Sequence, residues 1–151
     1  MAIPIRRTDR TMKKSTEELL NILKNTNNIS TYMEDQKETL DPVDLTEALE
    51  QLLDARSITK SDCIYRSGLD RTYCYQIFSG RKTPSRDKLL ALCLAMELSD
   101  AEVQSLLKQT GYAPLYPKLA RDSVILFAFY HKLSLTDLNE LLYEMDLELV
   151  Q

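Results

Sequence analysis

Helix caps and glycines alternate along this chain, and their alternation constrains the fold more than any other feature of the sequence. Thr59, Asp70 and Ser85 each stand just before a helical segment, where a side-chain oxygen can cap the first turn. Gly68 and Gly80 fall where such segments should end, because glycine readily adopts the left-handed conformation that closes a helix. The pattern predicts a series of short helices.

Composition also favours an all-α fold. The chain has 151 residues and only 3 Gly and 5 Pro, which leaves little material for a hairpin-rich β protein. Its hydrophobic content of 44% and charged content of 28% are typical of a soluble globular protein. No apolar run approaches the ~20 residues of a membrane span, and the N-terminus lacks an apolar secretion signal. We therefore expect a cytoplasmic protein with no membrane partner.

The N-terminal region, residues 1–43, is predicted to be an arm that is partly disordered. Its first fourteen residues are polar and basic, which favours disorder. Ser15 and Glu18 have the spacing of a capping box and predict a short helix over residues 16–25. The polar stretch that follows is ambiguous between loop and a second short helix. The arm is expected to be either free or packed on the rest of the protein.

The remaining chain is expected to hold a five-helix domain over residues 44–117 and a helical hairpin over residues 118–151 packed on it. Residues 86–109 align without gaps on residues 121–144, at an offset of 35. The alignment indicates either an internal repeat or the general likeness of two capped helical hairpins of equal length. Both interpretations predict a second hairpin that extends the core, with helices near 119–132 and 135–145.

Charge is distributed unevenly along the chain. The net charge is −4, but residues 57–88 carry seven basic and three acidic side chains and are net +4. The flanking residues 1–56 and 89–151 are net −3 and −5. A positive segment within an acidic chain indicates one localised surface for an anionic partner.

The sequence shows no arrangement of residues typical of a catalytic or metal site. Cys63, Cys74 and Cys93 have no CxxC spacing and fall at apolar positions of predicted helices, which favours buried thiols. His131 is the only histidine and is expected near a helix end, without a partner for a zinc site or a Ser-His pair. We therefore expect no enzyme, no catalytic residues, no metal and no cofactor.

Residues 60–79 have the layout of a helix-turn-helix motif. A first helix over Lys60–Ser67 and a second over Arg71–Ser79 would be joined by a tight turn at Gly68–Asp70. In such motifs the second helix can enter the major groove of DNA. The inward contacts that would hold the two helices together come from Cys63, Ile64, Leu69, Cys74 and Ile77.

These residues resemble the phage-repressor-like (lambda repressor-like), or xenobiotic-response-element (XRE), helix-turn-helix proteins of bacteria. The resemblance covers about residues 45–110 without an insertion. It implies a five-helix repressor-like domain, extended here by the C-terminal hairpin and the N-terminal arm. It also implies a transcriptional regulator that binds double-stranded DNA, with a homodimer reading two half-sites. The matching positions are Ile58-Thr59-Lys60, Cys63-Ile64, Gly68-Leu69-Asp70, Cys74, Ile77, Gly80 and Lys82-Thr83-Pro84-Ser85.

The family's base-reading positions correspond to Arg71, Thr72 and Gln76 in this chain. Their chemistry fits, because Arg can contact guanine through two bonds, Gln can do the same with adenine, and Thr offers a hydroxyl and a methyl group. The resemblance assigns DNA-backbone contacts to a further set of residues. These are Lys60, Tyr73, Tyr75, Ser79, Arg81 and Lys82.

A second interpretation is a protein-interaction module that keeps the repressor-like scaffold but does not bind DNA. Lys60 stands where the family has glutamine, and Phe78 where it has glutamate. Together with Tyr65, Tyr73 and Tyr75, Phe78 would give the reading surface an aromatic character, which is typical of protein contacts. One of the pair Tyr73 and Tyr75 is as readily explained by packing as by contact with DNA.

The C-terminal hairpin is rich in aromatic residues, and two roles are open for them. They would form either a dimer surface or an extension of the core, and dense apolar residues are more often internal. The candidates are Phe127, Phe129, Tyr130 and Tyr143.

Overall fold

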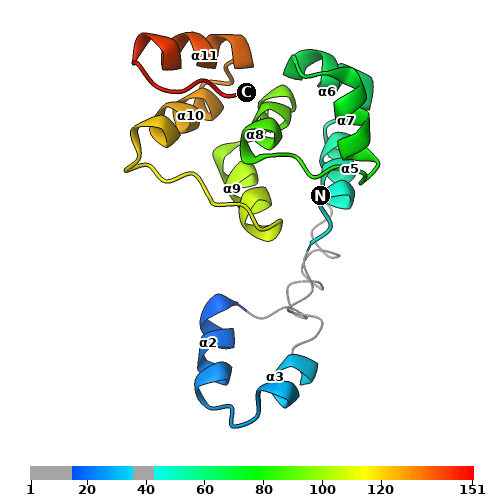
Figure 1. Ribbon diagram of the computed structural model, residues 1–151, viewed down its shortest axis with the longest axis vertical. Helices are drawn as coiled ribbons and strands as arrows, with labels where there is room; N and C mark the ends of the chain where they lie inside the picture. The colour runs from blue at the N-terminus through cyan, green and yellow to red at the C-terminus, as the bar shows by residue number, and fades with distance from the viewer. Residues whose placement is uncertain (1–14, 36–42) are drawn as a thin grey trace. The chain divides into compact units, whose positions relative to one another are not determined.

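The computed structural model describes residues 15–35 and 43–151, and these residues form nine α-helices and no strand (Figure 1). The expected all-α fold is confirmed. The chain divides into two compact units, with the boundary after Pro42. The predicted disorder of the first fourteen residues lies outside the described ranges. Within those ranges, no helix has the length and apolar character needed to cross a membrane.

The N-terminal unit contains helices α2 (Thr16–Lys24) and α3 (Ile29–Asp35). The predicted capping box at the start of α2 is present: Ser15 Oγ accepts the Glu18 N–H at 3.1 Å, and the Glu18 carboxylate accepts the Ser15 N–H at 3.2 Å. The short helix expected over residues 16–25 is therefore confirmed. No residue of α2 is buried, whereas Tyr32 of α3 is.

The larger unit begins with five helices, of which four surround the fifth, α8. Helix α8 (Arg86–Ala95) is buried at every position from Leu89 to Ala95. Helix α6 packs directly against α8, and α5 packs against α7. The caps predicted from the sequence are formed, since Thr59, Asp70, Ser85 and Ser99 each accept a backbone N–H three residues on. The other four helices are α5 (Leu45–Ala55), α6 (Lys60–Ser67), α7 (Arg71–Phe78) and α9 (Asp100–Gln109).

The C-terminal hairpin is formed by α10 (Ala120–Tyr130) and α11 (Leu135–Glu144), close to the helices expected there. It packs on the preceding hairpin, because α10 contacts α9 and α11 contacts α8. Phe129 is buried, so of the two roles left open for these aromatic residues it has that of extending the core. It follows Ile125 by one helical turn and shares that residue's inward face. Phe127, Tyr130 and Tyr143 are exposed.

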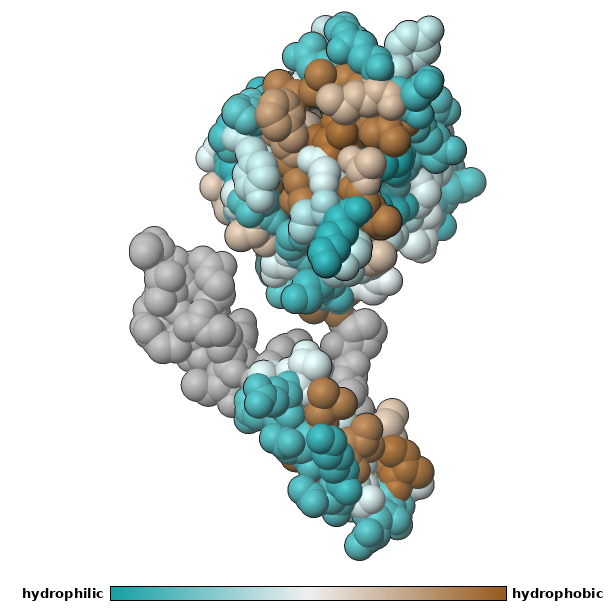
Figure 2. Space-filling model, turned by 90° about the vertical axis from the view of Figure 1, so that its left-hand side faces the viewer, coloured by the Kyte–Doolittle hydropathy of each residue, from teal (hydrophilic) through white to brown (hydrophobic). Residues whose placement is uncertain are grey.

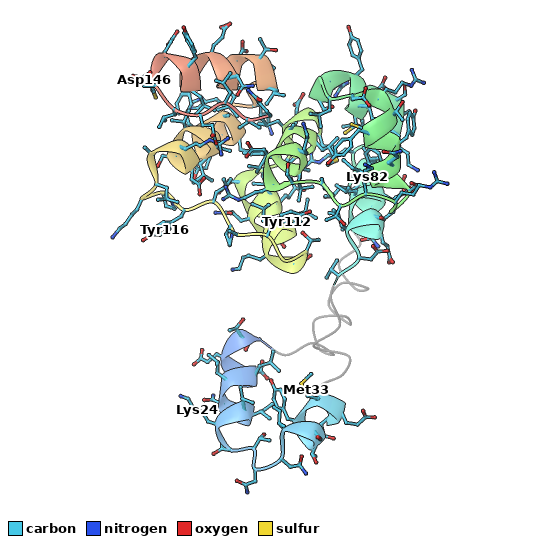
Figure 3. All side chains as sticks on the ribbon, in the orientation of Figure 1. Lys24, Met33, Lys82, Tyr112, Tyr116 and Asp146 are labelled. Atoms are coloured by element: carbon cyan, nitrogen blue, oxygen red, sulfur yellow. The ribbon has the colours of Figure 1, made fainter. Side chains whose placement is uncertain are left out.

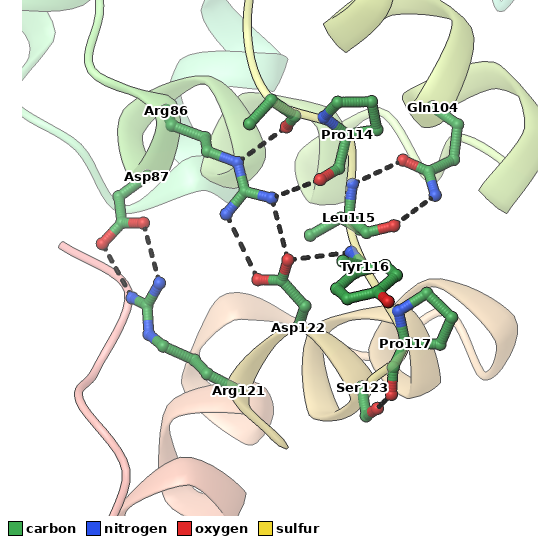
Figure 4. A network of polar contacts seen from close by, with 11 residues as sticks. Arg86, Asp87, Gln104, Pro114, Leu115, Tyr116, Pro117, Arg121, Asp122 and Ser123 are labelled. Atoms are coloured by element: carbon green, nitrogen blue, oxygen red, sulfur yellow. Dashed lines mark hydrogen bonds and ion pairs between the residues drawn. The ribbon is translucent and has the colours of Figure 1, made fainter. Parts of the chain in front are cut away.

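Residues 86–116 (the first repeat) and residues 121–151 (the second repeat) keep the offset of 35 in their hydrogen bonds. Figure 4 shows the bonds of the first repeat and the two Arg–Asp pairs that join the repeats. Arg86 donates to the carbonyl oxygens of Ala113 and Pro114, and Arg121 donates to those of Glu148 and Leu149. The Gln104 side chain both donates to and accepts from the backbone of Leu115. Asn139 holds the backbone of Val150 in the same way. Two unrelated hairpins of equal length would not share these clamps, so an internal repeat is favoured.

The contacts between the two repeats are reciprocal. Arg86 of the first repeat pairs with Asp122 of the second, and Arg121 of the second pairs with Asp87 of the first. Reciprocity of this kind is the signature of an interface across a two-fold axis. The two repeats are therefore related by an approximate two-fold rotation, like two subunits joined within one chain. Because each repeat uses the same face to contact the other, a third repeat could not be added through that face.

Candidate nucleic-acid interface

The turn between α6 and α7 is fixed by local hydrogen bonds. Gly68 ends α6 in the left-handed conformation, with φ 70°. The hydroxyl of the fully buried Ser67 donates to the Ile64 carbonyl at 2.7 Å and accepts the Leu69 N–H at 3.2 Å. Asp70 then caps α7 by accepting the Tyr73 N–H at 2.9 Å. Each bond lies within the motif, so the angle between the two helices is determined locally.

Helix α7 has one buried face and one face directed to solvent. Cys74, Ile77 and Phe78 are buried, at the i, i+3, i+4 spacing of a helix face. At about 100° per residue, five of the positions predicted to contact DNA share the opposite arc of about 140°, and Tyr73 lies outside it. These positions are Arg71, Thr72, Tyr75, Gln76 and Ser79; all are exposed except the half-buried Gln76.

The end of α7 holds two further cations beside this arc. Gly80, at φ 84°, closes the helix, and the N–H groups of Arg81 and Lys82 both donate to the Gln76 carbonyl, at 2.9 and 3.2 Å. Both side chains are exposed. Figure 3 shows Lys82 on the side of the larger unit formed by α5 to α7, away from Tyr116.

Residues 57–88 stay positively charged when the ion pairs within the chain are taken into account. Of their seven basic residues, Lys60 pairs with Glu50 at 2.6 Å and Arg86 pairs with Asp122 at 3.1 Å. Asp87 is occupied by Arg121, and Asp70 by its capping bond. Five basic side chains have no ion pair within the described residues. They are Arg66, Arg71, Arg81, Lys82 and Lys88.

Lys60 is placed differently from the other predicted DNA contacts. Its ammonium binds Glu50 and lies 5.9 Å from the centre of the Phe78 ring. The contact of Lys60 with a phosphate therefore stays a prediction, and it would require this cation to exchange or share its present partner. Sequence spacing did not indicate the pair, because Glu50 comes from the preceding helix.

The aromatic residues of the motif separate into buried and exposed groups. Phe78 is only 2% exposed, so its placement on the reading surface was wrong. Tyr73 is half-buried and packs against the core, with the Lys88 ammonium 5.8 Å from its ring centre. Tyr75 is exposed, and the Arg71 guanidinium carbon lies 5.6 Å from its ring centre. Tyr65, the third tyrosine of the motif, is 88% exposed.

A shallow cavity of about 300 Å³ lies between α6 and α7, next to the exposed arc. Tyr65 and Tyr75 line it together with Arg71, above the apolar side chains of Ile64 and Leu69. The full lining is Ser61, Ile64, Tyr65, Gly68, Leu69, Arg71 and Tyr75.

The cysteines of the domain have the properties of core residues. Cys63, Cys74 and Cys93 are all buried and free, as the sequence predicted. Burial raises the pKa of the Cys63 thiol to about 12 and also raises the pKa values of Cys74 and Cys93. None of them offers a thiolate at neutral pH. The part of the chain that the structure describes contains no group of His, Cys, Asp or Glu side chains arranged for a metal ion.

Comparisons with protein-family models, curated proteins and solved structures find no match to this chain. The interpretation of the site therefore depends on its own residues: an exposed polar helix face, five unpaired cations around it and a small cavity at its start.

Proposed function

We propose that this protein is a sequence-specific DNA-binding transcriptional regulator, with α5–α9 as a repressor-like domain and α7 as its reading helix. The observation that carries the proposal is the solvent-directed arc of α7. It presents Arg71, Thr72 and Gln76 together, on a helix whose opposite face is anchored in the core. A reading helix needs this combination, because base contacts require side chains held at a fixed depth in the major groove.

Each side chain has a distinct part in the proposed complex. Arg71 and Gln76 contact base edges, and Thr72 offers its hydroxyl or its methyl group. Arg81 and Lys82 bind phosphates beyond the end of α7, and Ser79 donates to one of them. The Arg71 guanidinium is positioned above the Tyr75 ring, which restricts its rotamers before DNA binds.

The proposal is tested by fluorescence anisotropy with a random duplex pool at about 50 mM salt, followed by selection of the bound sequences. The wild type is expected to bind and to enrich a common sequence. Arg71→Ala with Gln76→Ala is expected to abolish that enrichment. The matched control is Lys118→Ala with Gln109→Ala, which removes one exposed cation and one exposed amide from outside the α6–α7 motif. No binding by the wild type, or unchanged selection by the α7 double variant, overturns the proposal.

A second candidate is a protein-interaction module on the same scaffold, and the cavity between α6 and α7 favours it. An almost fully exposed tyrosine at the edge of an apolar cavity is a typical anchor for a protein contact. The salt dependence of binding distinguishes the two functions, because several phosphate contacts make DNA binding weaken steeply as the salt concentration rises. A partner held by Tyr65 and the cavity would depend on salt only slightly.

A further inference from the structure

The two-fold relation between the repeats identifies one surface that is covered in the first repeat and open in the second. Helix α6 packs along α8 of the first repeat, and Cys63 Sγ of α6 lies 3.9 Å from the Leu92 carbonyl oxygen. The corresponding helix of the second repeat is α10. Its face at the same positions is not covered by any helix of the larger unit, residues 43–151.

Exposure measures the difference directly. Leu92 is 0% exposed, and its counterpart Phe127 is 46% exposed. Ala95 is 6% exposed, and its counterpart Tyr130 is 61% exposed. By contrast, positions on the face shared by the repeats are buried in both: Leu90 and Ile125 are equivalent, and both are inaccessible. The face of α10 that includes Phe127 and Tyr130 therefore lacks the helix that α6 provides for the equivalent face of α8.

We call this open face the α10 stripe, and define it as Ser123, Val124, Phe127, Tyr130 and His131. Its aromatic side chains are ordered against one another, since the rings of Phe127 and His131 lie 4.2 Å apart between centroids. Figure 2 shows the side of the larger unit that includes α10 and α11, where apolar residues form a patch bordered by polar ones. Aromatic stripes of this kind are enriched at the centres of protein interfaces.

We propose that the α10 stripe is a homodimer interface, occupied by the same stripe of a second copy of this chain. A two-fold interface places a surface against itself, so it tolerates only a surface without strong charge of one sign. The stripe satisfies this condition, because it carries no acidic side chain and no lysine or arginine. Lys132, which follows it, is directed to the first repeat and donates to the Glu97 carbonyl at 3.2 Å.

The other exposed aromatic of the hairpin lies in an unsuitable setting for self-association. Tyr143 is on α11 between Glu140 and Glu144, and a second copy placed there would bring like charges together. A surface that carries these two glutamates favours solvent or a basic partner. Tyr143 is therefore the matched control for Tyr130: an exposed tyrosine of the same hairpin, outside the proposed interface.

The test is sedimentation equilibrium of the full chain over a range of micromolar concentrations, without DNA, so its outcome is independent of the proposed DNA binding. The wild type is expected to dimerise, and Tyr130→Glu and Phe127→Glu are each expected to raise the dissociation constant by at least about tenfold. Tyr143→Glu is expected to leave it unchanged. Circular dichroism of each variant checks that the fold is retained.

Three results would overturn the proposal. A wild type that stays monomeric at every concentration excludes the interface. Dimers that dissociate with Tyr143→Glu but not with Tyr130→Glu place the contact on α11. Dimers that dissociate only when Leu20→Glu and Ile29→Glu are introduced place it on the N-terminal helices, which also expose apolar side chains.

Discussion

Arg86 and Asp122 join the two repeats through a bidentate ion pair, with Nη1–Oδ1 at 3.2 Å and Nη2–Oδ2 at 3.1 Å. The two-fold-related pair of Arg121 and Asp87 has the same geometry, at 3.2 and 2.8 Å. The pairs differ in burial, because the Asp122 side chain is 6% exposed and that of Asp87 is 23% exposed. One chain thus contains the same interaction in two environments.

Asp122→Asn is expected to destabilise the protein more than Asp87→Asn. Loss of one charge leaves a guanidinium without its counter-ion, and the cost rises with burial, reaching about 3–5 kcal/mol for fully buried pairs. We expect about 3 kcal/mol for Asp122→Asn and about 1 kcal/mol for Asp87→Asn, measured by urea denaturation. An equal loss in the two variants would show that burial does not determine the strength of these pairs.

Stability is expected to fall in acid, in part through Asp122. Burial alone would raise the pKa of this carboxyl group, but hydrogen bonds from Arg86 and from the Tyr116 N–H outweigh it and lower the pKa. A pKa lower in the folded than in the unfolded chain adds stability above the unfolded value of about 3.9, and this stability disappears as pH falls through the folded value. The free energy of unfolding should therefore decrease below about pH 4.

The variant Asp122→Asn isolates this contribution. Its unfolding free energy is expected to depend less on pH below about 4 than that of the wild type, because the group that titrates has been removed. Some dependence should remain, since the pKa of Glu102 is also lowered: its hydrogen bonds with Ser99 and its pairing with Arg56 outweigh the effect of burial. An identical pH profile for variant and wild type would contradict the role of Asp122.

The local structure of this protein could be predicted from its sequence because its determinants are local. Ser99 and Glu102 are three residues apart, and they form the capping box that this spacing indicates. The inward position of Phe78 was also available from periodicity, since it shares a face with Cys74 and Ile77. The comparison with a polar family position concealed it.

Contacts between distant segments were not predictable in the same way. The offset of 35 is visible in the sequence, but the pairing of Arg86 with Asp122 depends on how the two hairpins rotate against each other. The engagement of Lys60 by Glu50 depends likewise on the approach of α5 to α6. Sequence spacing carries no information on such angles, so the charge available for a ligand could be counted only in the folded chain.

Gln104→Ala is expected to destabilise the first repeat by about 2 kcal/mol, because it leaves a buried backbone N–H and carbonyl without partners. The Gln104 amide binds both of these groups on Leu115, at 2.7 and 2.8 Å. Gln109→Ala is the control on the same helix, since Gln109 is exposed, and it should change stability by less than about 0.5 kcal/mol. Thermal denaturation of the two variants provides the comparison, and equal melting temperatures would show that the clamp contributes nothing.

Position 146 is expected to gain stability from glycine. Asp146 has φ 60° at the end of α11, and the equivalent residue at the end of α9 is Gly111, with φ 88°. A left-handed conformation costs an ordinary residue roughly 1 kcal/mol, and glycine avoids that cost. Asp146→Gly should therefore stabilise the protein by up to about 1 kcal/mol, and Gly111→Asp should destabilise it by a similar amount. Urea denaturation with a change of the same sign in both variants would contradict this explanation.

The salt dependence of DNA binding should follow the number of unpaired cations around α7. Five such side chains permit at most a slope of about −4.5 in log K against log salt for each chain, since each neutralised phosphate contributes about −0.9. Lys82→Ala, which removes a proposed phosphate contact, is expected to make the slope shallower by about 0.9. Lys60→Ala should change it less, because Glu50 already neutralises that ammonium. Equal changes in the two variants, measured by anisotropy with the selected duplex, would mean that DNA displaces Glu50 from Lys60.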